Sequence, residues 1–156
     1  MTPDPTMEAI GRAVEAGRAG DTAAAREELL RLWSTTADPL HRCTLAHYLA
    51  DLHDDPAEAL TWDIRALDAA DILTEQRVQE HHADLHIAGF YPSLHLNLAD
   101  NYRRLGSFKA ATEHITEAQK HAPNLPHTPY GDLIRGAIQE VTEAIAVRDR
   151  TRRASG

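Results

Sequence analysis

Apolar residues recur every three or four positions along most of the chain, which places them on one face of an α-helix. Proline, glycine and aspartate residues separate these stretches and predict where helices begin and end. The pattern predicts helices that begin near residues 6, 21, 39, 56, 93, 108 and 130. No stretch alternates apolar and polar residues with the β-branched enrichment of a strand. The expected fold class is therefore all-α.

Several helix boundaries have recognisable signals. Thr6 is the expected N-cap of the first helix, and either Asp21 or Thr22 is expected to cap the second. A proline after aspartate opens the third and fourth helices, because proline is tolerated in the first helical turn. Gly106 is expected to end the helix that contains Tyr102.

Residues 92–125 carry small and large apolar residues at positions that suit two closely packed helices. These residues are Leu98, Ala99, Tyr102, Gly106, Ala111, Ile115, Ala118 and Pro123. The set resembles the tetratricopeptide repeat, whose period is about 34 residues. The motif often has Trp where this chain has His95. In that motif the small residues let the two helices approach each other.

Weaker copies of the pattern begin at Thr6 and Pro39, so the resemblance covers residues 6–38, 39–72 and 92–125. It implies a right-handed stack of about three antiparallel helix pairs, a tetratricopeptide-like α-solenoid. Such stacks need a polar terminal cap, and the helix at 129–147 is the expected C-terminal one. A single domain would then span residues 1–147. The second copy departs from the motif at Asp63, where an apolar residue belongs.

Residues 73–91 are an insertion relative to the repeat period. They either extend the preceding helix or form a separate helix, with Gly89 as the expected end. Insertions in repeat stacks gather on one face, which is frequently the binding face.

The insertion is rich in histidine between residues 80 and 86. On a helix, His82 and His86 share a face at the spacing that suits a transition metal such as zinc. A third ligand would come from His95 or from an acidic residue elsewhere. The alternative interpretation is a solvated or hydrogen-bonded polar helix face. A metal- or small-ligand-binding protein is thus the second function hypothesis.

The sequence holds no recognisable catalytic motif. It lacks a nucleophile elbow, a glycine-rich phosphate loop and a cysteine beside a plausible base. The single cysteine, Cys43, falls on the inner side of a helix and is expected to be a small packed residue. No enzymatic activity and no cofactor are expected.

The leading hypothesis is an adaptor that binds a partner peptide or helix. Proteins that resemble tetratricopeptide stacks bind such segments along the groove formed by the first helix of each pair. The matching positions predict partner-binding residues, namely His47, Ser93, Asn97, Asp100, Arg103 and Arg104. Asn97 matches a site where chaperone-binding members clamp a terminal carboxylate, but the other clamp residues are missing here.

Charge and hydropathy restrict the remaining classes. The formal net charge of −8 disfavours binding of nucleic acid by the body of the domain. No run of about 18 apolar residues predicts a membrane span. The first residues do not resemble a signal peptide, so a cytoplasmic location is expected. Residues 148–156 are expected to form a basic, flexible and solvated tail, and apolar ends of the stack could support a homodimer.

Overall fold

The structure is a computed structural model that describes residues 4–81 and 89–153. All regular secondary structure in these two ranges is helical, which confirms the predicted all-α class for them. The helices are α1 Pro5–Arg18, α2 Thr22–Thr35, α3 Pro39–Asp51, α4 Pro56–Ile72, α5 Glu75–His81, α6 Tyr91–Arg104, α7 Phe108–His121, the 3₁₀ helix η2 Ala122–Asn124, and α8 Pro129–Ala146. Within the described ranges, none of them is both long and apolar enough to cross a membrane.

Four helices begin at an aspartate whose carboxylate accepts a hydrogen bond from a backbone N–H of the first turn. These N-caps are Asp4 for α1, Asp21 for α2, Asp38 for α3 and Asp55 for α4. The expected cap at Thr6 is wrong, because the Asp4 carboxylate accepts from the N–H of Met7 at 3.1 Å. A proline in the first turn is compatible with this geometry, since its missing N–H would lack an intrahelical partner anyway.

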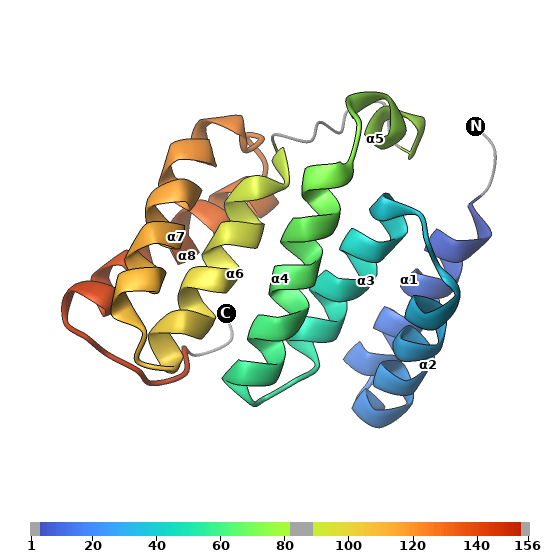
Figure 1. The fold of residues 1–156 in the computed structure, drawn as a ribbon, viewed down its shortest axis with the longest axis horizontal. Helices are drawn as coiled ribbons and strands as arrows, with labels where there is room; N and C mark the ends of the chain where they lie inside the picture. The colour runs from blue at the N-terminus through green and yellow to red at the C-terminus, as the bar shows by residue number, and fades with distance from the viewer. Residues whose placement is uncertain (1–3, 82–88, 154–156) are drawn as a thin grey trace.

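Consecutive helices pack in pairs, α1 on α2, α3 on α4, and α6 on α7 (Figure 1). The pairs follow one another because α2 contacts α3 and α4 contacts α6, while α8 packs on both α6 and α7. Gly106, at φ +82°, follows the C-cap of α6 and turns the chain into α7. This conformation favours glycine. The predicted end of this helix is thereby confirmed.

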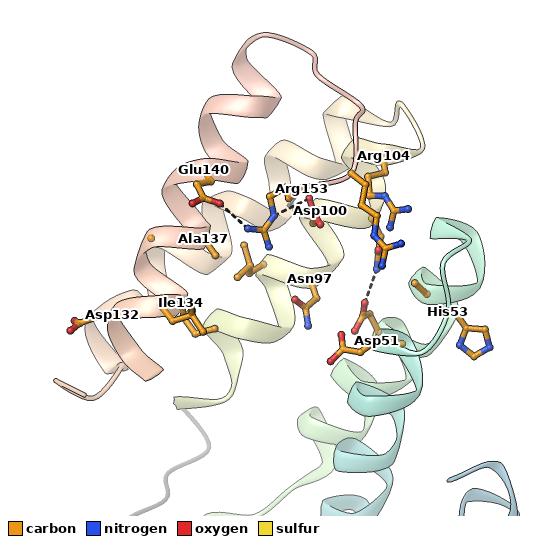
Figure 2. Close-up of a pocket in the computed structure, with 18 residues that line it drawn as sticks. Asp51, His53, Asn97, Asp100, Arg104, Asp132, Ile134, Ala137, Glu140 and Arg153 are labelled. Carbon is orange, nitrogen blue, oxygen red and sulfur yellow. Dashed lines mark hydrogen bonds and ion pairs between the residues drawn. The ribbon is translucent and has the colours of Figure 1, made fainter. Parts of the chain in front are cut away.

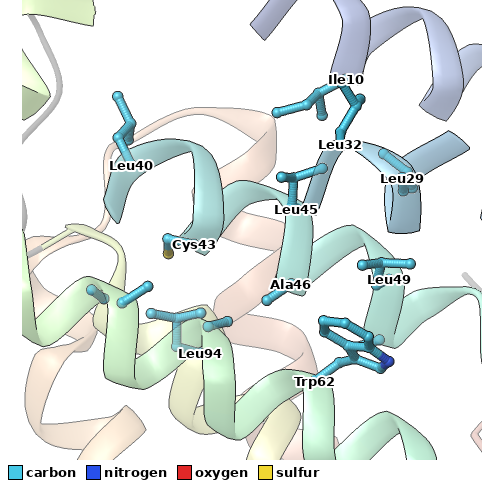
Figure 3. Close-up of a cluster of buried hydrophobic side chains, with 14 of the residues drawn as sticks. Ile10, Leu29, Leu32, Leu40, Cys43, Leu45, Ala46, Leu49, Trp62 and Leu94 are labelled. Carbon is cyan, nitrogen blue, oxygen red and sulfur yellow. The ribbon is translucent and has the colours of Figure 1, made fainter. Parts of the chain in front are cut away.

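Two clusters of buried apolar side chains hold the pairs together. The first lies among α1 to α4 and extends to Val78 of α5 and Leu94 of α6 (Figure 3). The second joins α6, α7 and α8. Ala99, Ala111 and Ala118 are fully buried, so small side chains do lie in the contact of α6 with its neighbours. Cys43 is buried in the first cluster, as predicted, and burial raises the pKa of its thiol to about 12.

The inserted segment contains a separate helix. Leu73 is extended after α4, and α5 begins at Glu75. The guanidinium of Arg77 donates to Asp38 Oδ2 at 2.9 and 2.7 Å, which ties α5 to the start of α3. The predicted end of the insertion at Gly89 cannot be compared, because residues 82–88 lie outside the described residues.

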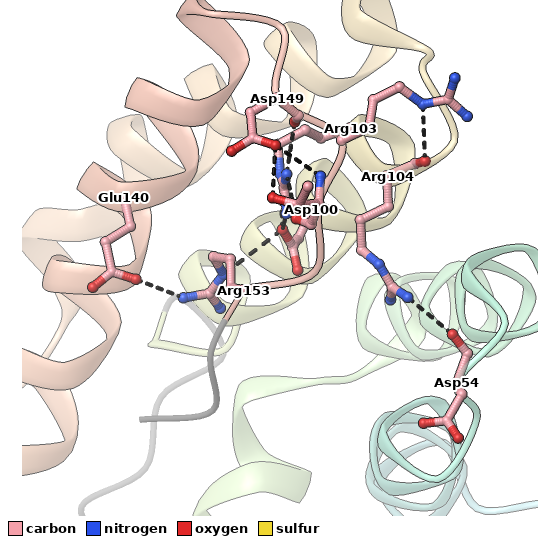
Figure 4. Close-up of polar contacts among 9 residues, drawn as sticks. Asp54, Asp100, Arg103, Arg104, Glu140, Asp149 and Arg153 are labelled. Carbon is pink, nitrogen blue, oxygen red and sulfur yellow. Dashed lines mark hydrogen bonds and ion pairs between the residues drawn. The ribbon is translucent and has the colours of Figure 1, made fainter.

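Residues 148–153, the C-terminal segment, are mostly exposed and also make specific contacts with the helices. Arg148 adopts φ +53°, and the chain then folds back beside α6. The carbonyl oxygens of Asp149 and Thr151 accept hydrogen bonds from Arg103 Nη1 at 2.7 and 2.8 Å (Figure 4). These two hydrogen bonds to one buried guanidinium hold the C-terminal segment in a defined position.

Candidate binding groove

A groove of about 710 Å³ opens between the second helix pair and helices α6 and α8 (Figure 2). Residues from α3, α4, α6 and α8 line it, and Arg152 and Arg153 of the C-terminal segment form part of its rim. A volume of this size fits a segment of peptide or a drug-sized molecule.

Asp63 of α4 forms the floor of the groove. Its residue surface is only 3% exposed, and its Oδ2 accepts a hydrogen bond from Asn101 Nδ2 at 2.6 Å. The other oxygen, Oδ1, is buried and has no hydrogen-bond partner in the part of the chain that the structure describes. An ionised carboxylate in this position loses its hydration without full compensation.

The environment of Asp63 favours its protonated form. Burial raises the pKa of Asp63 well above its ordinary value, and the charges of Asp51 and Asp100 raise it further. The amides of Asn101 and Asn97 oppose this rise. A positive charge that binds beside this carboxyl would lower its pKa and favour the ionised form.

Asp51 lies at the mouth of the groove, at the end of α3. Partial desolvation raises the pKa of its carboxyl, and the charge of His47 opposes the rise. Asp51 is exposed to solvent, whereas Asp63 is buried. A negative charge on Asp63 is therefore more unfavourable than one on Asp51. The two aspartates thus form an acidic path from the mouth to the floor.

The wall on the α8 side is apolar. Leu133, Ile134 and Ala137 of α8 line it, together with Leu96 of α6. Leu133 is 60% exposed, so a large apolar side chain faces solvent beside the groove. A bound segment could bury this surface, which is favourable by about 25 cal/mol per Å² of apolar area.

Arginines neutralise the acids around the rim. Arg153 pairs with Glu140 at 2.9 Å and approaches Asp100 at 3.7 Å, and Arg152 pairs with Asp54 at 2.8 Å. By contrast, Asp51 and Asp63 make no ion pair with a described residue. Among the acidic residues that line the groove, Asp51 and Asp63 are therefore the ones without an ion pair in the described structure, since Asp100, Asp132 and Glu140 are each paired with an arginine.

Three of the predicted partner-binding residues line this groove, namely Asn97, Asp100 and Arg104. Asn97 Nδ2 lies 3.4 Å from His47 Nδ1, so the structure also brings the predicted His47 close to the groove. The Arg104 guanidinium donates to the carbonyl oxygen of Asp54 at 2.9 Å, which holds α6 against the α3–α4 turn.

The other two predicted residues do not line the groove. Ser93 is buried, and its hydroxyl donates to the carbonyl oxygen of Phe90 at 3.3 Å. Arg103 is 0% exposed, because the C-terminal segment covers it and Asp100 accepts from its Nε and Nη2. The Arg103 guanidinium is thus hydrogen-bonded within the fold, and contact with a partner stays a prediction.

The predicted metal ligands His82 and His86 lie outside the described residues. Elsewhere in the described chain, no group of three or more His, Cys, Asp or Glu side chains is placed to hold a metal ion. His95, the proposed third ligand, is buried on α6. Its Nδ1 lies 3.0 Å from Nδ1 of His114, and the two rings stack at 5.3 Å.

Burial lowers the pKa of His95, and the neighbouring charge of His114 lowers it further. Burial also lowers the pKa of His114. Neutral rings suit this contact, because the protonated Nδ1 of one ring can then donate a hydrogen bond to the unprotonated Nδ1 of the other. The pair links α6 to α7.

Asp51 and Asp63 are not among the site residues that the sequence predicts. A signal for Asp63 was present, since it is an acidic residue at a position where the second predicted repeat calls for an apolar one. A polar residue inside an apolar pattern predicts either a weak repeat or a buried polar group, and here the second interpretation is right. Asp51 gave no such signal, because an aspartate in the last turn of a helix is common at surfaces.

Comparison of the chain with protein-family models, with curated proteins and with solved structures finds no match.

Proposed function

We propose that this chain is a tetratricopeptide-like helical repeat protein that serves as an adaptor. In this proposal the groove binds an extended or helical segment of a partner protein, and the chain performs no chemistry of its own. The order of the helix pairs supports it, because α1–α2, α3–α4 and α6–α7 pack successively and α8 closes the last pair. The buried alanines at the helix-crossing positions of the third predicted repeat also support the proposal.

The observation that carries the proposal is the composition of the groove. An exposed apolar wall on α8 faces a polar floor and mouth, and the lining includes Asn97, Asp100 and Arg104. Apolar area supplies affinity, while side-chain amides and charges set the register of a bound segment. A protein segment offers both kinds of group along one chain.

Site-specific photo-crosslinking in cells of the source organism tests this function. A benzoylphenylalanine replaces Leu133 on the groove wall in one variant and Leu30 in a control variant. Leu30 is an exposed leucine of α2 that lies outside the groove lining. We expect a defined crosslinked protein from position 133 that is absent from position 30.

Arg104→Glu combined with the crosslinker at position 133 should reduce the yield of the same product. Equal products from both positions, or no product from position 133, would overturn the adaptor proposal. A product formed only between two copies of this chain would replace it with self-association.

A further inference from the structure

The floor of the groove retains an unfavourable group. Asp63 replaces the apolar residue that the repeat pattern calls for, and one of its oxygens is buried without a hydrogen-bond partner among the described residues. Leaving such a group unpaired destabilises a fold. Natural proteins commonly keep destabilising groups where binding needs them.

The fold does not supply the missing positive charge. Each of the three C-terminal arginines near the groove is already used: Arg150 Nε donates to the carbonyl oxygen of Arg104, and Arg152 and Arg153 pair with Asp54 and Glu140. Arg104 of the groove lining donates to the carbonyl oxygen of Asp54, and the charge of His47 opposes the raised pKa of Asp51. The acids at mouth and floor are thus complementary to a cation from outside.

The chemistry of the site favours an organic cation over a metal ion. Metal sites of the usual kind use three or more protein ligands, and the described part of the chain offers no such group. The polar atoms beside Asp63 are side-chain amides of Asn97 and Asn101, which can orient a carboxylate. The groove is also far larger than one ion and has an apolar wall beside the acids.

We propose that the groove binds its partner through one basic side chain, a lysine or arginine, which passes Asp51 at the mouth and pairs with Asp63 at the floor. An apolar residue close to it in the partner packs on Leu133 and Ile134 of α8. This inference rests on the proposed adaptor function and specifies the chemistry of the segment that the groove recognises.

Insertion of the cation explains why Asp63 can remain in the core. In the free protein burial disfavours the ionised carboxylate of Asp63, and an arriving positive charge would stabilise it. The ion pair between the basic side chain and Asp63 then forms away from water. Removal of either charge from such a pair has a large effect on affinity. Selectivity follows, since a neutral side chain of the same length leaves Asp63 unpaired.

A phage-displayed library of random linear peptides, selected on the full-length protein, provides the probe. We expect enriched peptides to share one lysine or arginine beside a large apolar residue. The best peptide is then synthesised with its basic residue intact and with a neutral replacement, citrulline for arginine or norleucine for lysine. Affinity is measured by calorimetry for the wild type, Asp63→Asn and Asp68→Asn.

Asp68→Asn is the matched control, because Asp68 is an exposed aspartate of the same helix outside the groove lining. Loss of the charge pair should weaken binding at least tenfold, whether it is removed by Asp63→Asn or by the neutral peptide. The two changes together should cost little more than either alone, because both remove the same interaction. Asp68→Asn should change the affinity less than about twofold.

The outcomes separate the two proposals. If no peptide is enriched, or if enriched peptides bind equally well to Leu133→Glu, the groove does not bind peptides and both proposals fall. If groove-dependent peptides lack a basic residue, or keep their affinity for Asp63→Asn, the adaptor function stands and the basic-side-chain inference falls. The neutral peptide on wild-type protein decides the inference even if Asp63→Asn does not fold.

Discussion

At the scale of single residues, the position of a carboxylate matters more than the number of carboxylates. The chain has a formal net charge of −8, and most of its acids are exposed or paired with arginine. Asp63 differs because it is 3% exposed and only one of its oxygens accepts a hydrogen bond within the described structure. Its ionisation is therefore coupled to the stability of the fold.

Replacing Asp63 by Asn should increase the free energy of unfolding, and this gain over the wild type should be larger at higher pH. Between the unfolded pKa near 4 and the raised folded pKa, the folded state binds more protons, so the stability of the wild type falls with increasing pH. Asn imitates the protonated carboxyl and does not titrate. We expect a gain of about 1–3 kcal/mol at high pH and a smaller one near pH 4, measured by urea unfolding across this range. A gain that does not depend on pH, or the same trend in Asp68→Asn, would contradict this account.

At the scale of elements, most helices are defined locally, and a few contacts then fix how they are placed. Asp38 serves both purposes. Its Oδ1 accepts from the N–H of Leu40 and caps α3, while its Oδ2 accepts from Arg77 of α5. Loss of this carboxylate should affect the cap and the inserted helix together.

Asp38→Ala should lower the stability by about 1–2 kcal/mol, the usual effect of losing an N-cap. It should also increase amide hydrogen exchange in α5, because the two hydrogen bonds from Arg77 to Asp38 are lost. Asp55→Ala is the control, since Asp55 caps α4 by accepting from the N–H of Ala57. Similar exchange in α5 for the two variants would show that Asp38 does not position this helix.

The His95–His114 pair makes the α6–α7 contact sensitive to acid. Burial lowers the pKa of both rings, so the unfolded chain binds more protons than the folded one as the pH falls below about 6.5. Stability contributed at neutral pH is therefore lost on acidification. His114→Gln should reduce the decrease in melting temperature between pH 7 and pH 5, whereas the same change at exposed His127 should leave it unaltered.

At the scale of the whole molecule, the C-terminal segment joins parts of the chain that are distant in sequence. It supplies backbone acceptors to Arg103 of α6, and its Arg153 pairs with Glu140 of α8 (Figure 4). Its Arg152 pairs with Asp54 between α3 and α4. The segment therefore covers the buried guanidinium and shapes the rim of the groove.

Removal of residues 149–156 should destabilise the protein by about 1–3 kcal/mol, because a buried guanidinium then loses two carbonyl acceptors. Removal of residues 154–156 alone retains both acceptors and is the control. The two truncated proteins can be compared by thermal and urea unfolding. Equal stability would mean that solvent replaces the segment at Arg103 without penalty.

The sequence predicts the helices well because their signals are local. Prolines, glycines and aspartate caps act within one turn, so boundaries such as the one at Gly106 can be found without knowledge of the fold. The site could be predicted only in part. Asn97, Asp100 and Arg104 were identified from their places in a repeat, but the same reasoning included Arg103, which the structure buries.

What the sequence alone determined is the helical class and the position of each main helix, since apolar periodicity and capping are properties of short segments. Tertiary structure alone decided which polar groups meet. Asp63 and Asn101 are 38 positions apart and share a hydrogen bond only because α4 packs on α6. Long-range packing also explains Arg103. Its repeat position predicts a groove residue, but its side chain is buried because a distant backbone segment folds over it. Burial and unpaired charge, which together define the candidate site, depend on such long-range packing.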